Sequence, residues 1–574
     1  MIRSILCAAA AGALLAVPAG AQTPRFEPRP CQPAIEGARC GTVQVPENRD
    51  APGRMIALNV LVLPARSATP AREAITFFGG GPGQAATEFA RGVAGVFAPL
   101  RDERDLLFID QRGTGRSGVL NCPLRDTANP QSYLDDFLPP AAVARCREAL
   151  SRTADLTRYG YTELAHDVDA VRAALGYERL DLQGGSYGTR AAMVYLRNYP
   201  ARVRSVVLQS GVPPEYYPPA DYARDLDAAL AGLAAECRAE AACAAAFPDP
   251  VGEARAVADR LDAARGVAEI VDPLSGARLR LTVSRGTFVE TVRRMMYDPG
   301  QARGVPLLIH RAFEGDLRPV ARASLQDRRN MERTGGLGLY LAITCGEDVP
   351  FIDLAAAAAD NGRTLGGDYR VRQQAEACRG WPRYALPADY HQTFRSDVPA
   401  LLTSGALDPA TPPRWGEAGA AAFPNGVHLV VPQAGHGYRG MVGSACVDSL
   451  VIEFLRQGAA RGLDTSCVRN VRRHPFVVEA PAESITLDHA AVARFAGTYA
   501  GTAGQRPMQM RIESLDGVLR GTVGGDRVIA TPLSATTFRW EGFAPGYLLE
   551  FSEDGSTLNL RTPGDPPVAL TRTP

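Results

Sequence analysis

A glycine-rich pentapeptide holds the clearest candidate for a reacting side chain. Gly184-Gly-Ser-Tyr-Gly188 has the form G-x-S-x-G, and it follows an apolar strand pattern and precedes a helical one. In that context a sharp strand-to-helix turn lifts the central hydroxyl off the sheet edge, and the small residues on either side let strand and helix approach. The bare pattern also occurs in ordinary glycine and serine loops, so the flanks carry the interpretation. We predict that Ser186 is a nucleophile.

A serine hydroxyl reacts only when a base accepts its proton and a carboxylate orients that base. On this kind of sheet the expected chain order is Ser, acid, His, each on a loop that follows a strand. Asp408 follows the strand pattern Leu401–Ser404, and His436 follows Val427–Val431. We predict Asp408 as the orienting acid and His436 as the base. The other candidates are less suitable. His428 lies in the middle of a strand, and Asp397 precedes its strand. His166, His310 and His391 fall in helical or linker contexts, and His474 and His489 lie beyond the core.

Acyl transfer also needs two backbone N–H groups that stabilise an oxyanion. One is predicted at Tyr187, directly after the nucleophile. The other is predicted at Gly81, in Gly79-Gly-Gly-Pro-Gly83, because Pro82 has no N–H to donate. A tight glycine turn is the structural alternative for this loop.

The segments around these residues alternate between strand and helix. Unbroken apolar runs suit parallel strands buried on both faces, and strand–helix alternation indicates an α/β domain with a mostly parallel sheet. Two antiparallel strands are expected within 41–65. The strands expected next are Ile75–Phe78, Leu106–Ile109, Leu180–Gln183, Val203–Leu208, Leu401–Ser404 and Val427–Val431, with helices over Tyr161–Leu175, Thr189–Tyr199 and Cys446–Gln457.

Two stretches depart from this rhythm. Residues 216–395 are rich in alanine and arginine with helical periodicity, which predicts a large helical cap inserted between Ser186 and Asp408. From about residue 490, short alternating runs with glycine turns predict a small antiparallel β-domain after a proline-containing linker. The expected division is 1–21 signal peptide, 22–215 first part of the core, 216–395 cap, 396–474 second part of the core and 485–574 C-terminal β-domain.

Residues 1–21 predict a signal for export to the periplasm or the extracellular space. Arg3 gives a positive start, the apolar stretch that follows is too short to cross a bilayer, and Ala19-Gly-Ala21 fits a cleavage site. Removal of this segment takes Cys7 and leaves ten cysteines, which in an oxidising compartment suggests five disulfides. Sequential pairing is expected, with some free buried thiols as the alternative: Cys31/Cys40, Cys122/Cys146, Cys237/Cys243, Cys345/Cys378 and Cys446/Cys467.

Composition excludes several function classes. The 574 residues carry 62 basic and 62 acidic side chains, so nothing indicates a nucleic-acid-binding face. All 62 basic residues are arginine, which excludes every mechanism that needs a catalytic lysine. No Cys-x-x-Cys or histidine cluster has the spacing of a metal site. We expect no cofactor, no metal, no nucleic-acid partner and no membrane span in the mature chain; the oligomeric state is left open.

Five motifs in order resemble α/β-hydrolases of the prolyl aminopeptidase and tripeptidyl aminopeptidase type, over roughly residues 30–470. They are Gly79-Gly-Gly-Pro-Gly83, Asp110-Gln-Arg-Gly-Thr-Gly-Arg-Ser117, Gly184–Gly188, Leu407-Asp-Pro-Ala-Thr-Pro412 and Gly435-His-Gly437. The resemblance implies the α/β-hydrolase fold, the roles given above for Ser186, Asp408 and His436, and a structural role for 110–117. It also supports the pairing of Cys446 with Cys467. Gly79 and Tyr187 stand where prolyl aminopeptidases usually have His and Trp, which favours the tripeptidyl branch.

The resemblance implies an exported serine hydrolase that releases residues or short peptides from free peptide N-termini through an acyl-enzyme. An esterase acting on small acyl esters is the alternative within enzymes, and a non-catalytic binding protein on the same scaffold is the third hypothesis. In the resembling aminopeptidases, acids of the cap hold the substrate's α-amino group. Glu347 and Asp348 are the candidates here; the alternative is that both are solvated or cap a helix.

Overall fold

The computed structural model describes residues 24–573, apart from 33–34, 52, 273–274, 276, 480–484, 486, 504–505, 516–517, 524–525, 541–546 and 563–565. The expected signal peptide, with Cys7, therefore lies outside the described residues. Residues 480–484 of the expected linker near 475–485 lie outside them as well.

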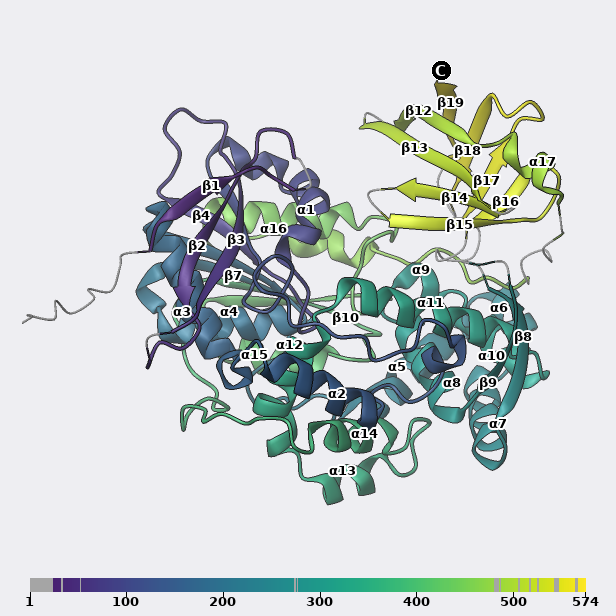
Figure 1. Cartoon of the computed structure of the whole chain (residues 1–574), viewed down its shortest axis with the longest axis horizontal. Helices are drawn as coiled ribbons and strands as arrows, with labels where there is room; N and C mark the ends of the chain where they lie inside the picture. The colour runs from purple at the N-terminus through teal and green to yellow at the C-terminus, as the bar shows by residue number, and fades with distance from the viewer. Residues whose placement is uncertain are drawn as a thin grey trace, which may run out of the picture.

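A nine-stranded sheet forms the centre of the molecule, in the order β1-β2-β3-β5-β4-β6-β7-β10-β11 (Figure 1). The first strands pair antiparallel, and all pairs from β5 to β11 are parallel. The predicted mostly parallel sheet is thereby confirmed. The strands are β1 (Phe26–Arg29), β2 (Arg39–Pro46), β3 (Met55–Leu63), β4 (Glu73–Phe78), β5 (Asp105–Ile109), β6 (Arg179–Gly185), β7 (Val203–Gln209), β10 (Ala400–Gly405) and β11 (Gly426–Val431).

Helices cover both faces of the sheet, as its buried apolar strands require. One core joins β4, β6 and β7 to α3 and α4, and a second joins the opposite face to α1 and α16. These helices lie on opposite sides of the strands in Figure 1. The helices of this region are α1 (Ala90–Val96), α2 (Pro140–Ser151), α3 (Tyr161–Leu175), α4 (Tyr187–Asn198), α15 (Pro413–Ala420) and α16 (Ala445–Gln457).

The segment between β7 and β10 is helical, as its periodicity predicts. It also contains an antiparallel pair, β8 (Gly266–Val271) with β9 (Arg278–Val283), where almost no strand was expected. The helices of this segment do not all share one core: those within residues 222–334 have a hydrophobic core of their own, whereas those at Leu337–Ile343 and Tyr369–Cys378 belong to the core that contains β4, β6 and β7. In chain order the helices are α5 (Tyr222–Ala239), α6 (Ala241–Ala246), α7 (Pro250–Ala263), α8 (Arg285–Met295), α9 (Pro299–Ala302), α10 (Val305–Phe313), α11 (Arg318–Thr334), α12 (Leu337–Ile343), α13 (Leu354–Asn361) and α14 (Tyr369–Cys378).

The C-terminal strands close into an eight-stranded antiparallel barrel, drawn in yellow in Figure 1. An antiparallel β-domain was predicted, but not its closure, which removes the exposed sheet edges. Aromatic rings fill its interior, with Phe495 packed against Phe538 and Phe551. The elements are α17 (His489–Ala493), β12 (Gly497–Ala503), β13 (Arg506–Leu515), β14 (Val518–Val523), β15 (Asp526–Pro532), β16 (Thr537–Trp540), β17 (Leu548–Phe551), β18 (Thr557–Arg561) and β19 (Val568–Thr573).

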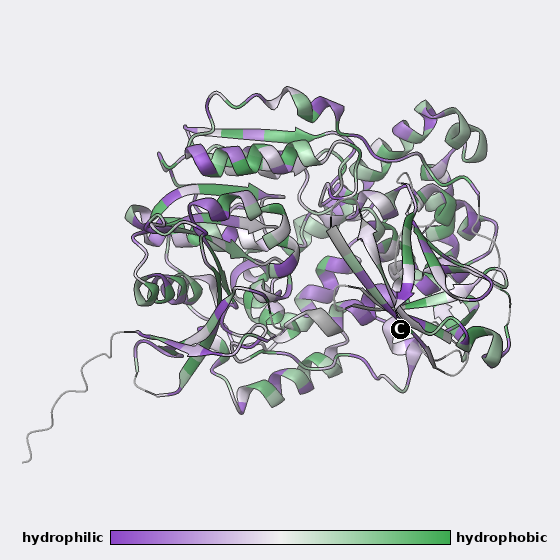
Figure 2. Cartoon of the chain, turned by 90° about the horizontal axis from the view of Figure 1, so that it is seen from above, coloured by the Kyte–Doolittle hydropathy of each residue, from purple (hydrophilic) through white to green (hydrophobic). Residues whose placement is uncertain are grey.

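Hydropathy along the helices explains how they are held in place. Figure 2 shows green and purple residues alternating along most helices, the pattern of one apolar and one polar face. In α3 the buried residues include Leu164, Val168 and Val171, which recur at helical spacing. Burial of such a face supplies most of the stability of a helix in a protein.

Five disulfides join neighbouring cysteines in the order predicted: Cys31–Cys40, Cys122–Cys146, Cys237–Cys243, Cys345–Cys378 and Cys446–Cys467. Two of them tie helices to the segments beside them. Cys345–Cys378 joins the end of α14 to a π-helical turn, Thr344–Asp348. Cys446–Cys467 fixes the start of α16 to the segment after it.

Replacing both Cys446 and Cys467 by serine should lower the free energy of unfolding by about 3 kcal/mol. The bond closes a loop of 21 positions, and loss of that restraint increases the entropy of the unfolded chain. Denaturant titration of wild type and the double variant, both unreduced, measures the difference. Mass mapping of unreduced peptides is the control, and free thiols or crossed pairs would contradict the pairing.

Candidate active site

Ser186 lies in the tight turn between β6 and α4. Its backbone has φ 54° and ψ −128°, a left-handed conformation that L-residues rarely adopt. The turn is held from both sides, because Ser186 N donates to Gln209 O at 2.9 Å and Thr189 Oγ1 donates to Ser186 O at 2.6 Å. The side chain thus stands at the C-terminal edge of the parallel sheet.

Glycine is required on both sides of the serine because the backbones lie so close together. A Cβ at Gly184 would lie 2.4 Å from Gly188 O, and one at Gly188 would lie 2.3 Å from Phe78 O. Real Cβ atoms do not approach oxygen this closely. The G-x-S-x-G spacing therefore reflects contact of strand, helix and the neighbouring strand β4.

Asp408 and His436 are in direct contact on the loops after β10 and β11. His436 Nδ1 lies 2.8 Å from Asp408 Oδ2. Asp408 is 1% exposed and also accepts hydrogen bonds from Ala410 N, Thr411 N and Thr411 Oγ1. Burial raises the pKa of Asp408, but the charge and hydrogen bond of His436 and the Thr411 donors outweigh it, so its pKa lies below the ordinary value. The carboxylate is therefore ionised at neutral pH and can orient the imidazole.

The loops that carry Ser186 and His436 both contact the end of β7, at two consecutive residues. Gln209 accepts the backbone hydrogen bond of Ser186, and the next residue, Ser210, donates its hydroxyl to His436 O at 2.9 Å. Ser210 has a positive φ of 54°, so the chain turns sharply between the two loops. This corner places the predicted nucleophile and base on either side of the same strand end.

The glycine loop after β4 lies against the same turn. A Cβ at Gly80 would lie 3.1 Å from both Gly185 O and Ser186 Cβ, so this stretch of main chain approaches the serine closely. Gly81 has a φ of 111°, where a larger residue would be strained. Gly83 is covered by the cap, since Gly336 N donates to Gly83 O at 3.1 Å. Gly81 and Tyr187 remain the predicted oxyanion donors.

Asp110 holds the chain that follows the glycine loop through hydrogen bonds. Its buried carboxylate accepts hydrogen bonds from Thr87 N at 3.0 Å, Thr87 Oγ1 at 2.8 Å, Asn59 Nδ2 at 2.8 Å and Arg116 N at 3.2 Å. Thr87 follows the glycine loop by four residues. The contacts therefore agree with a structural role for the first residue of the 110–117 motif.

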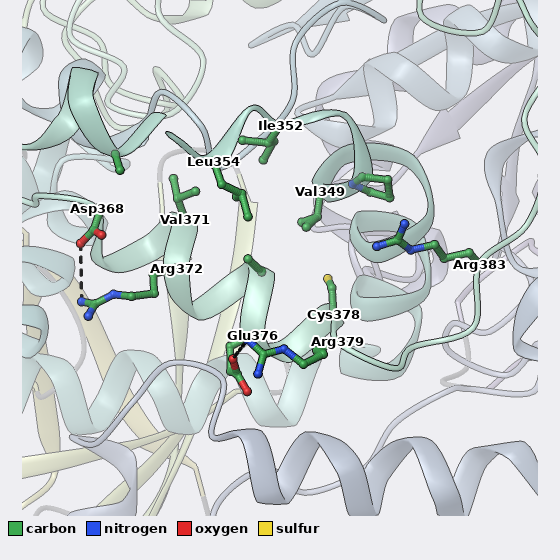
Figure 3. A pocket seen from close by; sticks show the side chains of 13 residues that line it. Val349, Ile352, Leu354, Asp368, Val371, Arg372, Glu376, Cys378, Arg379 and Arg383 are labelled. Carbon is green, nitrogen blue, oxygen red and sulfur yellow. Dashed lines mark ion pairs between the residues drawn. The ribbon is translucent and has the colours of Figure 1, made fainter. Parts of the chain in front are cut away.

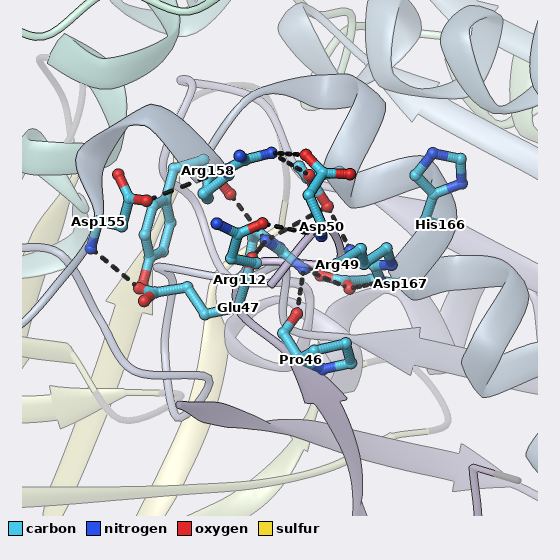
Figure 4. A network of polar contacts seen from close by, with 12 residues as sticks. Pro46, Glu47, Arg49, Asp50, Arg112, Asp155, Arg158, His166 and Asp167 are labelled. Atoms are coloured by element: carbon cyan, nitrogen blue, oxygen red, sulfur yellow. Dashed lines mark hydrogen bonds and ion pairs between the residues drawn. The ribbon is translucent and has the colours of Figure 1, made fainter. Parts of the chain in front are cut away.

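A buried network continues from the same motif (Figure 4). Arg112, 1% exposed, forms a two-pronged ion pair with Asp167 at 2.6 and 2.7 Å. It also donates to Glu47 O and Arg158 O, and Arg49 donates to Asp167 Oδ1, which Arg112 shares. A planar guanidinium suits such shared pairs better than a lysine ammonium would. The network fixes β2, α3 and the motif to one another.

The cap acid Glu347 is completely buried, so the solvated alternative is excluded. Its carboxylate accepts hydrogen bonds from Tyr161 N and Tyr384 Oη, both at 2.8 Å, and from Tyr390 Oη. Burial raises the pKa of Glu347 against these donors. Because Glu347 is completely buried, the residues around it would have to move before its carboxylate could bind a substrate amine.

The other cap acid, Asp348, is also completely buried and contacts the nucleophile's helix. It forms an ion pair with Arg190 and accepts a hydrogen bond from Tyr187 Oη at 2.9 Å. Both partners belong to the first turn of α4. Asp348 thus links the cap to the residue that follows Ser186, a contact the sequence did not indicate.

Two cap residues that lie near the predicted base and acid were not identified in the sequence analysis. The ring of Tyr297 lies 4.7 Å from that of His436, and Tyr297 O accepts from Gly437 N. Asp225, on α5, pairs with Arg414 at 2.8 Å. Neither lies in a motif that the sequence analysis recognised, and both come from the alanine- and arginine-rich cap.

A separate cavity of about 540 Å³ lies on the cap (Figure 3). It lies between α14 and the segment Val349–Leu354, with Arg372 paired to Asp368 and Arg379 to Glu376 at its rim. None of Ser186, Asp408 or His436 lines it, so it is not the candidate active site.

Neither a metal site nor a membrane helix is found in the described part of the chain. Among those residues no group of three or more His, Cys, Asp and Glu side chains could hold a metal ion. None of the described helices is long and apolar enough to cross a membrane.

Asp225 should make stability depend on pH near neutrality. Burial raises its pKa to about 7, with Arg414 opposing and Asp408 adding to the rise. The folded state then keeps a proton that the unfolded state releases above about pH 4, so Asp225 lowers the unfolding free energy as pH rises from about 4 to 7. The Tm of Asp225→Asn relative to wild type should therefore increase over this range. Parallel Tm curves would contradict the assignment.

Comparisons with known proteins agree with this geometry. A family model described as an alpha/beta hydrolase fold matches residues 73–258, and one described as a TAP-like protein matches residues 363–467. "Serine protease Hip1" of Mycobacterium tuberculosis is 27% identical over 488 residues, 75% of this chain and 87% of that protein. "Tripeptidyl aminopeptidase" of Streptomyces coelicolor is 26% identical over 474 residues, 76% and 84% of the two chains. "Carboxylesterase B" of M. tuberculosis is 26% identical over 480 residues, 75% and 87%.

Both halves of the sheet therefore match hydrolase family models, and the relatives align across the cap that separates them. The fold and the resemblance inferred from the five motifs are confirmed. The chain has the α/β-hydrolase fold, and its family-model matches and relatives support a place among the tripeptidyl aminopeptidase-like hydrolases.

Proposed function

We propose that the protein is an exported serine peptidase that releases residues or short peptides from free peptide N-termini. The observation that carries this proposal is the hydrogen-bonded pair of Asp408 and His436. The loop of His436 and the strained turn of Ser186 are both bonded to the end of β7. The relatives named as a serine protease and a tripeptidyl aminopeptidase support peptide chemistry.

In the proposed mechanism His436 Nε2 takes the proton of Ser186 Oγ while the oxygen attacks the scissile carbonyl carbon. Asp408 holds Nδ1–H, which keeps the imidazole in the tautomer with a free Nε2 and stabilises its charged form. The N–H groups of Tyr187 and Gly81 stabilise the oxyanion of the tetrahedral intermediate. His436 then protonates the departing amine, and water releases the acyl group from Ser186 by the reverse sequence.

The cap provides the proposed restriction to small substrates. Gly336 of the cap lies on the glycine loop, and Tyr297 lies on His436, so cap residues border the site on two sides. We also propose the division of the chain given by the sequence, with the cap at 216–395 and the C-terminal β-domain at 485–574. Glu347 and Asp348 remain candidates for binding the substrate's amine.

Export is proposed on two grounds. The first 21 residues have the charge, apolar stretch and cleavage site of a signal peptide. Five disulfides also indicate an oxidising compartment, because cytosolic thiols are normally kept reduced.

Ester hydrolysis is the second candidate function. The same three residues hydrolyse esters as readily as amides in principle, and one relative is named carboxylesterase B. A binding protein without catalysis would be expected to lack one of the three residues, and all three are present.

Ser186→Ala should abolish hydrolysis while leaving the fold intact. Loss of a triad nucleophile typically lowers turnover on the order of 10⁶-fold. Turnover of peptide and ester substrates by purified protein, with the Tm as a control for folding, measures this. Thr189→Ser, which keeps the hydroxyl bonded to Ser186 O, is the matched control and should remain active. More than a few per cent of wild-type activity in Ser186→Ala would rule out the nucleophile.

Acetylating the substrate's N-terminus should lower kcat/KM by about tenfold or more. A buried carboxylate gains a charge-assisted hydrogen bond from an ammonium group, and a blocked amine cannot supply it. Free and acetylated peptides are compared on wild type and on Glu347→Gln. Equal cleavage of both peptides would overturn the aminopeptidase proposal and favour the esterase. A preference for free peptides that Glu347→Gln leaves unchanged would remove only that residue's role.

A further inference from the structure

Four arginine side chains, three from the cap and one from the core, gather in the interior of the protein. Arg125 comes from the loop before α2, Arg293 from α8, Arg328 from α11 and Arg370 from α14. Each residue is between 4% and 8% exposed. Side chains of this type are almost never so deeply buried unless they are paired. We refer to these four residues as the arginine cluster.

The arginine cluster contains more positive charge than its neighbours neutralise. Glu290 is the carboxylate at its centre: it pairs with Arg293 at 2.8 Å and lies 3.7 Å from Arg370. Arg293, Arg370 and Arg328 together outweigh burial and lower the pKa of Glu290 to about 2. One carboxylate thus faces three guanidinium groups.

The remaining groups near the arginine cluster do not balance this charge. Asp327 is already paired with Arg294, at 3.0 Å. Glu332 lies near Arg125 and accepts a hydrogen bond from Leu124 N. Tyrosines supply most of the other neighbours, among them Tyr222, Tyr340 and Tyr369, and Asp136 near Tyr369 is exposed.

Several N–H groups of the arginine cluster have no hydrogen-bond partner among the described residues. These are Arg328 Nη1, Arg370 Nε and Nη1, and Arg125 Nε, all of them fully buried. An unpaired buried donor costs roughly 1–3 kcal/mol, and more when it is charged. In native proteins such buried donors are commonly satisfied by an ion or a water molecule that occupies the space in front of them. The free donors therefore indicate a place for a polar or anionic group.

Stacking of Arg370 and Arg328 on the ring of Phe137 explains only part of how these buried charges are stabilised. The guanidinium carbons of Arg370 and Arg328 lie 3.9 and 4.4 Å from the centre of its ring. A ring attracts a cation through its face, but the N–H bonds of a guanidinium lie in its own plane and stay free. Burial, together with the charge of Arg125, lowers the pKa of Arg328 to about 10, which indicates a positive charge without sufficient compensation.

The arginine cluster is connected to the candidate active site through one residue. Arg293 Nη1 donates to Tyr297 Oη, and the Tyr297 ring packs on His436 at 4.7 Å. An anion held by the arginine cluster would therefore lie on the cap side of the base.

We propose that the arginine cluster is a binding site for a small oxyanion, with Arg328 and Arg370 as its principal donors. The forked N–H groups of arginine match the two oxygens of a carboxylate or of phosphate. Two sources share this chemistry: a carboxylate of the substrate, such as a peptide C-terminus, or a free inorganic anion. The substrate source rests on the proposed peptidase function; anion binding itself does not.

Anion binding is tested by thermal unfolding of the full chain in phosphate, with chloride at equal ionic strength as reference. The Tm of wild type should rise by about 2 °C or more and saturate at millimolar phosphate, since a ligand that binds only the folded state stabilises it. Arg328→Gln should lose this saturable rise. Arg372→Gln is the matched control: Arg372 lies on the exposed side of α14, with a side chain 68% exposed, and this variant should respond like wild type.

The source of the anion is tested with peptides that carry a free or an amidated C-terminus. If the substrate supplies the carboxylate, Arg328→Gln should raise KM about tenfold or more for the free peptide and leave the amidated peptide unchanged. A phosphate response without this difference assigns the arginine cluster to a free anion. Absence of activity in wild type would remove the peptidase proposal and leave the thermal test standing.

The proposal is overturned if wild-type Tm shows no saturable response to phosphate or sulfate and KM does not distinguish the two peptides. Should Arg328→Gln fail to fold, Arg328→Lys replaces it, because a lysine keeps the charge and loses the fork. An Arg328→Lys variant that responds to phosphate like wild type would likewise overturn the role of Arg328.

Discussion

The lack of space around Ser186 constrains much of the molecule. Strand β6, helix α4 and the glycine loop after β4 meet there with their backbones in contact, so that side chains cannot fit at Gly184 or Gly188, and a Cβ at Gly80 would be tightly packed. Such contact is possible only if β4 and β6 are neighbouring parallel strands, as the sheet order provides. The left-handed backbone of Ser186 is maintained because Gln209 and Thr189 hold it on both sides. Strain at this one residue is thus supported by the arrangement of three strands.

The cap takes part in forming the site as well as covering it. Asp348 reaches down to Tyr187 and Arg190 on α4, and Gly336 lies on the glycine loop. Both contacts involve buried polar groups, which are costly to leave without partners. Folding of the cap and ordering of the backbone that carries the predicted oxyanion donors, Gly81 and Tyr187, are therefore coupled. The Cys345–Cys378 bond, close to Asp348, restrains the same turn.

Residues in local motifs could be predicted, and residues positioned by tertiary contacts could not. Ser186, Asp408 and His436 each follow a strand that is visible as an apolar run, so their placement at one sheet edge follows from the parallel order. The pair β8–β9 was missed although Arg278–Val283 alternates in type, because the surrounding helical periodicity dominated. Closure of the barrel depends on β12 pairing with β19, a contact between the two ends of the domain. Tyr297 and the partners of Glu347 depend likewise on how distant helices meet.

The buried polar groups of the cap that lack a hydrogen-bond partner indicate which chemical groups the site can recognise. Glu347 already accepts three hydrogen bonds, and Asp348 is paired with Arg190, so both cap acids are occupied by the protein itself. Among the described residues, the buried donors of the cap without a partner include N–H groups of Arg328 and Arg370, and the buried acceptors without one include Asp225 Oδ2 and Asn361 Oδ1. A buried surface recognises the charge opposite to the one that it leaves unpaired. In this conformation the arginine cluster is therefore prepared to receive an anionic group, whereas recognition of a free amine by Glu347 requires the residues that bury its carboxylate to rearrange.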